Sequence, residues 1–182
     1  MSSSQSPRAF IPLGIAVLTV SDTRSLEDDK SGSLLAARVE AAGHSLADRD
    51  IVADEVALIR ARVSAWATDE KIDAIITTGG TGLTGRDITP EALTPLFDKV
   101  IDGFSAVFHR ISFDKIGLST IQSRATAGII SGTYVFALPG SPGACKDGWD
   151  GILKDQLDYR THPCNFVEIM PRLDEHLRRK KN

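Results

Sequence analysis

Short runs of apolar and β-branched residues alternate with segments of helical periodicity through the first half of the chain. Gly14–Val20 (GIAVLTV) and Asp73–Thr78 (DAIITT) have the composition of strands that are buried on both faces of a parallel sheet. Ser45–Val52 reads as a weaker strand, whereas Ser31–Ala42 and the segment that follows Asp54 place their apolar residues at helical spacing. This alternation predicts an α/β domain with right-handed crossovers between parallel strands.

The second half of the chain continues the pattern. Helices are expected over Pro90–Lys99, Phe104–Lys115 and Pro142–Gln156, with a hairpin turn at Ser131-Gly132 and a strand over Tyr134–Leu138. We therefore expect an α/β fold of three layers, α/β/α, around a mostly parallel central sheet. One domain should occupy residues 10–176, and the polar ends, 1–9 and 177–182, should be flexible termini.

Charge and cysteine content narrow the functional classes. Among 182 residues, 21 Lys and Arg face 24 Asp and Glu, a net charge of −3, whereas nucleic-acid binders usually carry a basic excess. We therefore expect no nucleic-acid partner. Cys145 and Cys164 form no C-x-x-C pair, so neither a zinc site nor a disulfide framework is indicated. No apolar segment approaches the roughly 18 residues of a membrane-spanning helix, so we expect a cytoplasmic protein without membrane contact.

Three loops that follow expected strands carry unusual sequences. In open α/β sheets, ligands bind at the carboxyl ends of the strands, so these loops are the candidate binding site. Their candidate ligand-binding residues are Ser21, Asp22 and Thr23 in the first loop, Gly79, Gly80, Thr81, Gly82 and Arg86 in the second, and Pro139, Gly140, Ser141, Pro142 and Gly143 in the third.

Two of these loops lead directly into expected helices. Thr89-Pro90 and Ser141-Pro142 each read as an N-cap followed by proline at the first helical position. Glycine before a helix start lets backbone amides approach an anion, which favours phosphate or carboxylate binding. The alternative is that the loops are only tight connections.

The second loop matches two known glycine patterns only in part. Gly80-x-Gly82-x-x-Gly85 has the spacing of a dinucleotide-binding turn, but Pro90 moves the expected helix start well beyond Gly85. A phosphate-binding loop of the Walker type would need Lys-Ser or Lys-Thr where this chain has Arg86-Asp87. Another source of positive charge is therefore required for a polyphosphate.

Carboxylates that bind Mg²⁺ would provide that charge. Asp54 and Asp87 both follow expected strands, and Mg²⁺ is usually bound by one or two carboxylates together with substrate phosphates. Asp54 has the alternative role of a helix N-cap, and Asp87 that of a solvated loop residue. Arg86 would either bind a phosphate or lie exposed beside an aspartate.

The loop motifs resemble those of the MogA/MoaB family of molybdenum cofactor biosynthesis proteins, which is related to the gephyrin G and Cnx G domains. The similarity lies in Val20–Thr23, Thr77–Gly82, Gly85–Ala92 and Leu138–Pro142, and extends over about residues 10 to 170. Within the family, Gln122–Ala125, Gln156–Asp158 and Arg160–Phe166 resemble the bacterial MoaB branch.

The resemblance implies a molybdopterin adenylyltransferase, which transfers AMP from Mg-ATP to the molybdopterin phosphate and releases pyrophosphate. It places the two essential aspartates of active members at Asp54 and Asp87, as catalytic and metal-binding residues; Ala53 stands where active relatives often have proline. It also implies a homo-oligomer, trimeric or hexameric. Some members of the MoaB branch lack these carboxylates, so the alternative is a non-catalytic molybdopterin-binding or assembly protein of the same pathway.

Overall fold

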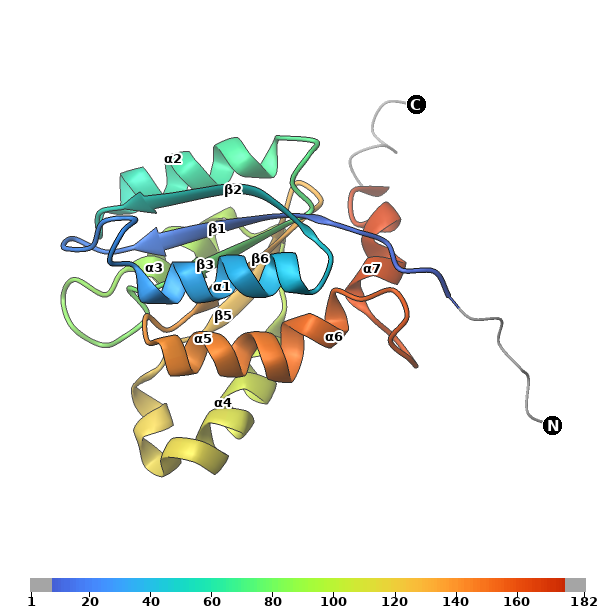
Figure 1. Ribbon diagram of the computed structural model, residues 1–182. Coiled ribbons are helices and arrows are strands. Elements are labelled where there is room, and N and C mark those ends of the chain that lie inside the picture. The colour runs from blue at the N-terminus through green and yellow to red at the C-terminus, as the bar shows by residue number, and fades with distance from the viewer. Residues whose placement is uncertain (1–7, 176–182) are drawn as a thin grey trace.

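A six-stranded sheet forms the centre of the computed structural model, which describes residues 8–175 (Figure 1). The strand order is β2-β1-β3-β6-β5-β4. The strands are β1 (Gly14–Val20), β2 (Ser45–Val52), β3 (Ala74–Thr78), β4 (Lys99–Val100), β5 (Thr126–Ile130) and β6 (Thr133–Leu138). The pairs β2-β1, β1-β3 and β3-β6 are parallel, and β5 runs antiparallel to both β6 and β4. The expected mostly parallel sheet is confirmed.

Helices connect these strands and cover both faces of the sheet. They are α1 (Lys30–Ala41), α2 (Val56–Ala67), α3 (Thr89–Leu93), α4 (Asp102–Ile116), α5 (Pro142–Gly148), α6 (Lys154–Gln156) and α7 (Phe166–Ile169). Shorter or irregular turns are η1 (Thr94–Leu96), η2 (Gly117–Gln122), η3 (Trp149–Leu153) and η4 (Met170–Arg172). The helical segment expected over 142–156 is continuous, but its middle part, η3, is a π-helix.

The helix expected over Pro90–Lys99 forms only in its first half, so the prediction is wrong for the second half. It ends at Leu93 and continues as the 3₁₀ turn η1, because Pro95 has no N–H with which to extend an α-helical ladder. Lys99 and Val100 instead form β4, which pairs with Ile129 and Gly128 of β5. The expected turn between β5 and β6 is present, with positive φ at Ser131 and Gly132.

Two hydrophobic cores separate the three layers. On one face, alternate residues of β1, β3 and β6, such as Val17, Ile76 and Phe136, pack against α1, α4, α5 and η3. On the other face, Leu18 and Ile75 and their neighbours pack against α2 and α3. Figure 1 shows α1 and α5 side by side in front of the sheet and α2 above β2. The expected α/β/α layering is thus confirmed.

The described body begins before residue 10. Arg8, which was expected in a flexible terminus, donates from Nη1 to the carbonyl oxygen of Tyr159 at 3.3 Å and pairs with Glu168. The rest of the expected polar termini, apart from Ala9, lies outside the described residues. Within residues 8–175, the structure contains no helix that combines the length and the apolar composition needed to cross a bilayer.

Gly128 of β5 provides a test of packing at the antiparallel side of the sheet. The ring of Phe97 lies against it, and a Cβ at Gly128 would be 2.3 Å from Phe97 Cγ. We expect Gly128→Ala to lower the free energy of unfolding by about 1–3 kcal/mol, because the ring must leave this position. Urea unfolding followed by circular dichroism measures the change.

Gly103→Ala is the matched control. Gly103 lies in the first turn of α4, and a Cβ there would meet no heavy atom within 4 Å. Alanine is favoured over glycine in helices, so this variant should be as stable as the original chain or more stable by up to about 1 kcal/mol. Equal unfolding midpoints for the two alanine variants would contradict the packing argument.

Candidate functional site

The three loops identified from the sequence meet at the carboxyl ends of β1, β3 and β6. The backbone N–H of Gly79 donates to the carbonyl of Leu138 at 3.1 Å, which joins the second loop to the end of β6. A Cβ at Gly79 would lie 2.2 Å from the carbonyl oxygen of Val20, and one at Gly140 would lie 3.2 Å from Gly79 Cα. The loops therefore pack backbone to backbone, at a distance that only glycine permits at position 79 and that is tight for any other residue at position 140.

An ion pair connects the first and second loops. Arg86 donates from Nε and Nη2 to the two carboxylate oxygens of Asp22, at 2.9 and 2.8 Å. Asp22 also accepts a hydrogen bond from the backbone N–H of Asp54 at 3.0 Å. These two donors, Arg86 first, lower the pKa of Asp22. Arg86 is thus exposed and lies beside an aspartate, which was one of its two expected roles. The aspartate that it contacts, Asp22, is 64 residues away in the sequence.

Asp54 does not cap a helix, so that alternative is wrong. Helix α2 begins at Val56 with Glu55 as N-cap, and no side chain makes a capping bond there. The carboxylate lies beside the second loop instead, since a Cβ at Gly80 would be 3.1 Å from Asp54 Oδ1. Burial, followed by the negative charge of Asp22, raises the pKa of Asp54. A cation near this carboxylate would relieve that unfavourable environment.

Asp87 is held by its own loop, so it is not a freely solvated residue. Its Oδ2 accepts from the backbone N–H of Thr84 at 2.8 Å and from the Thr84 hydroxyl at 2.6 Å. The hydroxyl bond from Thr84 is the main reason that the pKa of Asp87 is lowered. Oδ2 would lie only 2.7 Å from a Cβ at Gly82. Asp54 and Asp87 therefore flank the short stretch Gly80–Gly82.

The two expected N-caps have different outcomes. Ser141 caps α5, and its hydroxyl accepts from the N–H of Ala144 at 3.2 Å. Thr89 is not a cap, because α3 begins at Thr89 itself, with Ile88 before it. The Thr89 hydroxyl donates to the carbonyl of Gly79 at 2.8 Å, so it fixes the start of the second loop.

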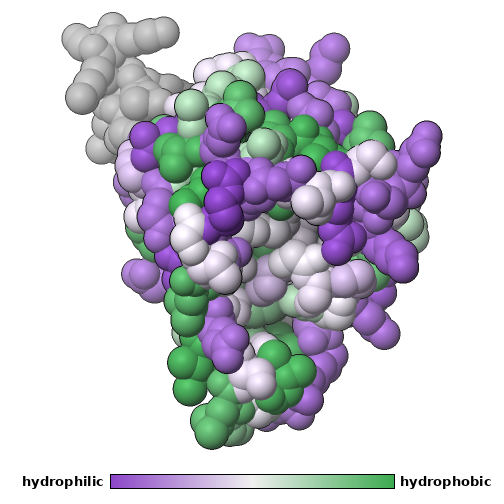
Figure 2. Space-filling view, turned by 90° about the vertical axis from the view of Figure 1, so that its left-hand side faces the viewer, coloured by the Kyte–Doolittle hydropathy of each residue, from purple (hydrophilic) through white to green (hydrophobic). Residues whose placement is uncertain are grey.

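A cavity of about 360 Å³ opens between the second and third loops and α4 with η2. The loops contribute Gly80, Thr81, Gly82, Asp87, Pro139, Gly140 and Ser141, and the facing wall consists of Phe108, Ser112, Ile116, Ser119, Gln122, Ser123 and Ala144. Figure 2 looks at this end of the molecule and shows a pale central surface bordered by hydrophilic residues. Ser21, Asp22, Thr23, Asp54, Gly79, Arg86, Pro142 and Gly143 are not part of this lining.

Sequence reasoning missed the facing wall and one charged residue, Arg124. The wall comes from α4, from η2 and the residue after it, and from Ala144 of α5, and no local pattern in these segments marked it. The backbone N–H of Arg124 donates to Thr81, and its guanidinium donates to the carbonyls of Gly82 and Asp87. The resemblance of Gln122–Ala125 to a branch of the family was the only signal near it.

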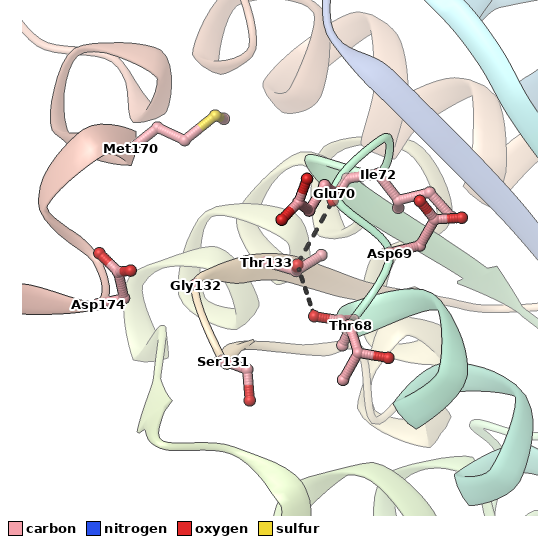
Figure 3. Close-up of a pocket in the computed structure, with 10 residues that line it drawn as sticks. Thr68, Asp69, Glu70, Ile72, Ser131, Gly132, Thr133, Met170 and Asp174 are labelled. Carbon is pink, nitrogen blue, oxygen red and sulfur yellow. Dashed lines mark hydrogen bonds between the residues drawn. The ribbon is translucent and has the colours of Figure 1, made fainter. Parts of the chain in front are cut away.

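A second hollow of about 400 Å³ lies at the opposite end of the sheet (Figure 3). There the hydroxyl of Thr133, the first residue of β6, donates to the carbonyls of Ala67 and Ile72 at 3.4 Å. Its charged lining residues are all acidic, namely Asp69, Glu70 and Asp174. Such a hollow repels anionic ligands, so it does not compete with the loop site for a phosphate-bearing substrate.

Metal binding at the loop site would depend on carboxylates alone. Within residues 8–175, no three His, Cys, Asp or Glu side chains are grouped as a metal site. Asp54 and Asp87 nevertheless suit Mg²⁺, which needs only one or two protein carboxylates when phosphates and water complete its octahedron. The donor set thus fits a cation that arrives with a polyphosphate.

Known proteins are similar to this chain in sequence and in fold. Residues 16–159 match the family described as a probable molybdopterin-binding domain. The molybdenum cofactor biosynthesis protein B of Escherichia coli K12 is 50% identical over 163 residues, which cover 90% of this chain and 96% of that protein. Its namesake in Bacillus subtilis 168 is 50% identical over 142 residues, covering 78% and 84% of the two chains. A crystal structure of a molybdenum cofactor biosynthesis protein B aligns with a TM-score of 0.79 at 40% identity, covering 84% of this chain and 94% of that one.

Gly80 tests the geometry of the second loop. Its φ is +63°, and a Cβ would lie 2.4 Å from the Thr89 hydroxyl that supports Gly79. We expect Gly80→Ala to lower the free energy of unfolding by about 1–3 kcal/mol, through backbone strain and this clash. Gly85→Ala, where a Cβ meets nothing within 4 Å, should change it by less than about 0.5 kcal/mol. Urea titrations measure the free energy of unfolding of both variants. Coincident unfolding curves would contradict the loop geometry assigned to Gly80.

Proposed function

The chain belongs to the family of probable molybdopterin-binding domains and has a role in molybdenum cofactor biosynthesis; from this premise we propose that it is a molybdopterin adenylyltransferase. In the proposed reaction, the terminal phosphate of molybdopterin attacks the α-phosphorus of ATP. A new P–O–P linkage forms, the bond between the α-phosphorus and the bridging oxygen breaks, and pyrophosphate leaves. Such a transfer depends on alignment and charge neutralisation more than on covalent catalysis.

The observation that carries the proposal is the position of the two aspartates. Asp54 and Asp87 flank Gly80–Gly82, and neither makes a side-chain ion pair among those of the described chain. Asp22, in contrast, is neutralised by Arg86. Two carboxylates that form no ion pair within the described residues, beside a glycine loop, suit the binding of Mg²⁺ with the phosphates of ATP. When bound, Mg²⁺ would neutralise the charge that develops on those phosphates.

The remaining groups of the site suit anions and a flat polar ring. Gly80, at positive φ, has no side chain to extend over the cavity that it lines, so its backbone can contact phosphate oxygens there. The Arg86 side chain is 61% exposed, which leaves its guanidinium accessible to a phosphate beside its contact with Asp22. In the cavity wall, the apolar Phe108 and Ile116 stand beside hydroxyl and amide groups such as those of Ser119 and Gln122. This mixture fits a pterin, which is flat and rich in hydrogen-bonding atoms.

The decisive experiment incubates the protein with molybdopterin and Mg-ATP and measures pyrophosphate and adenylylated pterin. We expect product, and we expect Asp87→Asn and Asp54→Asn each to lower the rate about 100-fold, because each removes charge that would hold Mg²⁺. Molybdopterin binding, followed by fluorescence, should change much less. Asp155→Asn, an exposed carboxylate on α6, is the control and should leave the rate unchanged.

The outcomes also separate the alternative function. No product from the original chain, together with tight molybdopterin binding, would contradict the transferase and support a non-catalytic molybdopterin-binding or assembly protein. An unchanged rate of product formation in both asparagine variants would contradict the roles proposed for Asp54 and Asp87.

We further propose that the chain is a homo-oligomer that uses the surface of α4 and η2. Large apolar side chains on these elements are 46% to 73% exposed: Val107, Phe113, Ile116, Leu118 and Ile121. Figure 2 shows hydrophobic residues gathered at the lower end of the molecule, where Figure 1 places the end of α4. A group of exposed apolar side chains of this kind is typical of a contact between subunits.

Sedimentation velocity tests the assembly. The original chain should sediment as a trimer or hexamer of its 19.6 kDa subunit. The double variant Leu118→Asp with Ile121→Asp should shift it to smaller species, because carboxylates would be buried without partners. Leu26→Asp, at an exposed apolar residue outside this surface, is the control. A monomeric original chain would contradict the proposal.

A further inference from the structure

Arg124 makes an unusual set of contacts with the second loop. Its backbone N–H donates to the carbonyl of Thr81 at 3.0 Å. Its guanidinium donates from Nε to the carbonyl of Gly82 at 2.8 Å and from Nη2 to the carbonyl of Asp87 at 2.7 Å. The remaining nitrogen, Nη1, pairs with the Glu91 carboxylate. One residue thus binds the loop at four points between Thr81 and Glu91.

The backbone of the second loop makes few hydrogen bonds within the loop, although the Asp87 carboxylate is bonded to Thr84. Within residues 79–89, the backbone N–H of Asp87 donates to the carbonyl of Thr84, and that of Thr89 donates to the carbonyl of Gly80. Gly82 and Gly85 give the chain wide conformational freedom, which must be removed before Asp87 can hold one orientation. The Arg124 guanidinium supplies fixed donors to the carbonyls on both sides of that flexible part. It therefore closes the loop from the outside.

Arg124 is itself anchored to regular structure. It lies two residues before β5, and the N–H of the preceding residue, Ser123, donates to Thr120 of η2 at 3.0 Å. His109 of α4 contacts the carbonyl of Ser123 through Nε2 at 3.0 Å. The side chain of Arg124 is 30% exposed, so most of it is packed rather than solvated. The guanidinium therefore holds the second loop in a fixed position relative to α4 and β5.

We propose that Arg124 is the positioning residue of the site, which sets the second loop so that the Asp87 carboxylate faces the cavity. Asp87 is reached through its own backbone carbonyl, so Arg124 acts on the carboxylate through the loop and not by direct contact. The planar fork of arginine is required, because three acceptors in different directions must be served at once. Lysine would keep the charge but would not reproduce this geometry.

Hydrogen exchange measured by mass spectrometry tests the proposal without any substrate. In Arg124→Met, amides in peptides that cover residues 79–91 should exchange about tenfold faster or more, whereas core peptides of β1 and β3 should not change. Arg124→Lys should resemble Arg124→Met in this loop. Arg38→Met is the matched control, since Arg38 also forms a two-point pair, with Asp150, but lies outside the site.

A second test measures activity, and it rests on the proposed adenylyl transfer. Here we expect kcat to fall about 10- to 100-fold in both Arg124 variants with a smaller change in KM for molybdopterin, because a displaced Asp87 affects the reacting phosphates more than the pterin. Arg38→Met should keep the original kcat.

Two results would overturn the inference. One is unchanged exchange of residues 79–91 in a folded Arg124→Met protein. The other is recovery of both exchange protection and kcat in Arg124→Lys, which would reduce the role of Arg124 to its charge. If Arg124→Met does not fold, Arg124→Lys decides alone. Absence of transfer by the original chain would contradict only the proposed function, because the exchange result does not depend on it.

Discussion

Thr19, Thr78 and Leu138 lie in register across β1, β3 and β6, so the three loops that follow begin at one edge of the sheet. Because these strands are parallel, their carboxyl ends are brought together whatever the length of the crossover between them. Every feature of the candidate site depends on this register. A shift of one strand by one residue would separate Gly79 from Leu138 and would turn the apolar residues of that strand to the wrong face.

The overall charge of −3 would not help the site to bind the anions that we propose for it. Its electrostatics are local and divide its carboxylates into two kinds. Asp22 has a permanent partner in Arg86, and that pair ties two loops together. Asp54 is half-buried, and its pKa is raised by burial and by the negative charge of Asp22. Such a carboxylate beside a second one is suited to the divalent cation, and through it to the polyphosphate, of the proposed function.

The sequence predicted the layers, the parallel sheet and the three loops, because hydrophobic periodicity and glycine patterns are local signals. It assigned Thr89 to a cap and left capping open for Asp54, since a residue before a helix looks the same whether it bonds to that helix or to a distant loop. The pairing of Asp22 with Arg86 spans 64 residues and depends on how β1 and β3 pair. The contacts of Arg124 span about 40 residues and depend on how β5 and α4 pack. The sequence shows which residues are charged, but it does not show which of them pair in the fold.

Glycine loops are flexible, yet the carbonyls of this site are held from behind by hydroxyl groups. Thr89 donates to Gly79, Thr78 donates to Pro139 at 3.0 Å, and Ser31 donates to Gly140 at 2.8 Å. Each donor is buried and lies on a helix or strand, so the loop carbonyls are turned toward the protein. With their carbonyls bound, these peptide groups cannot rotate freely, and their positions are settled before a ligand arrives. Preorganisation of this kind lowers the cost of binding and of reaching a charged transition state, and it explains why a site made of loops needs buried threonine and serine beneath it.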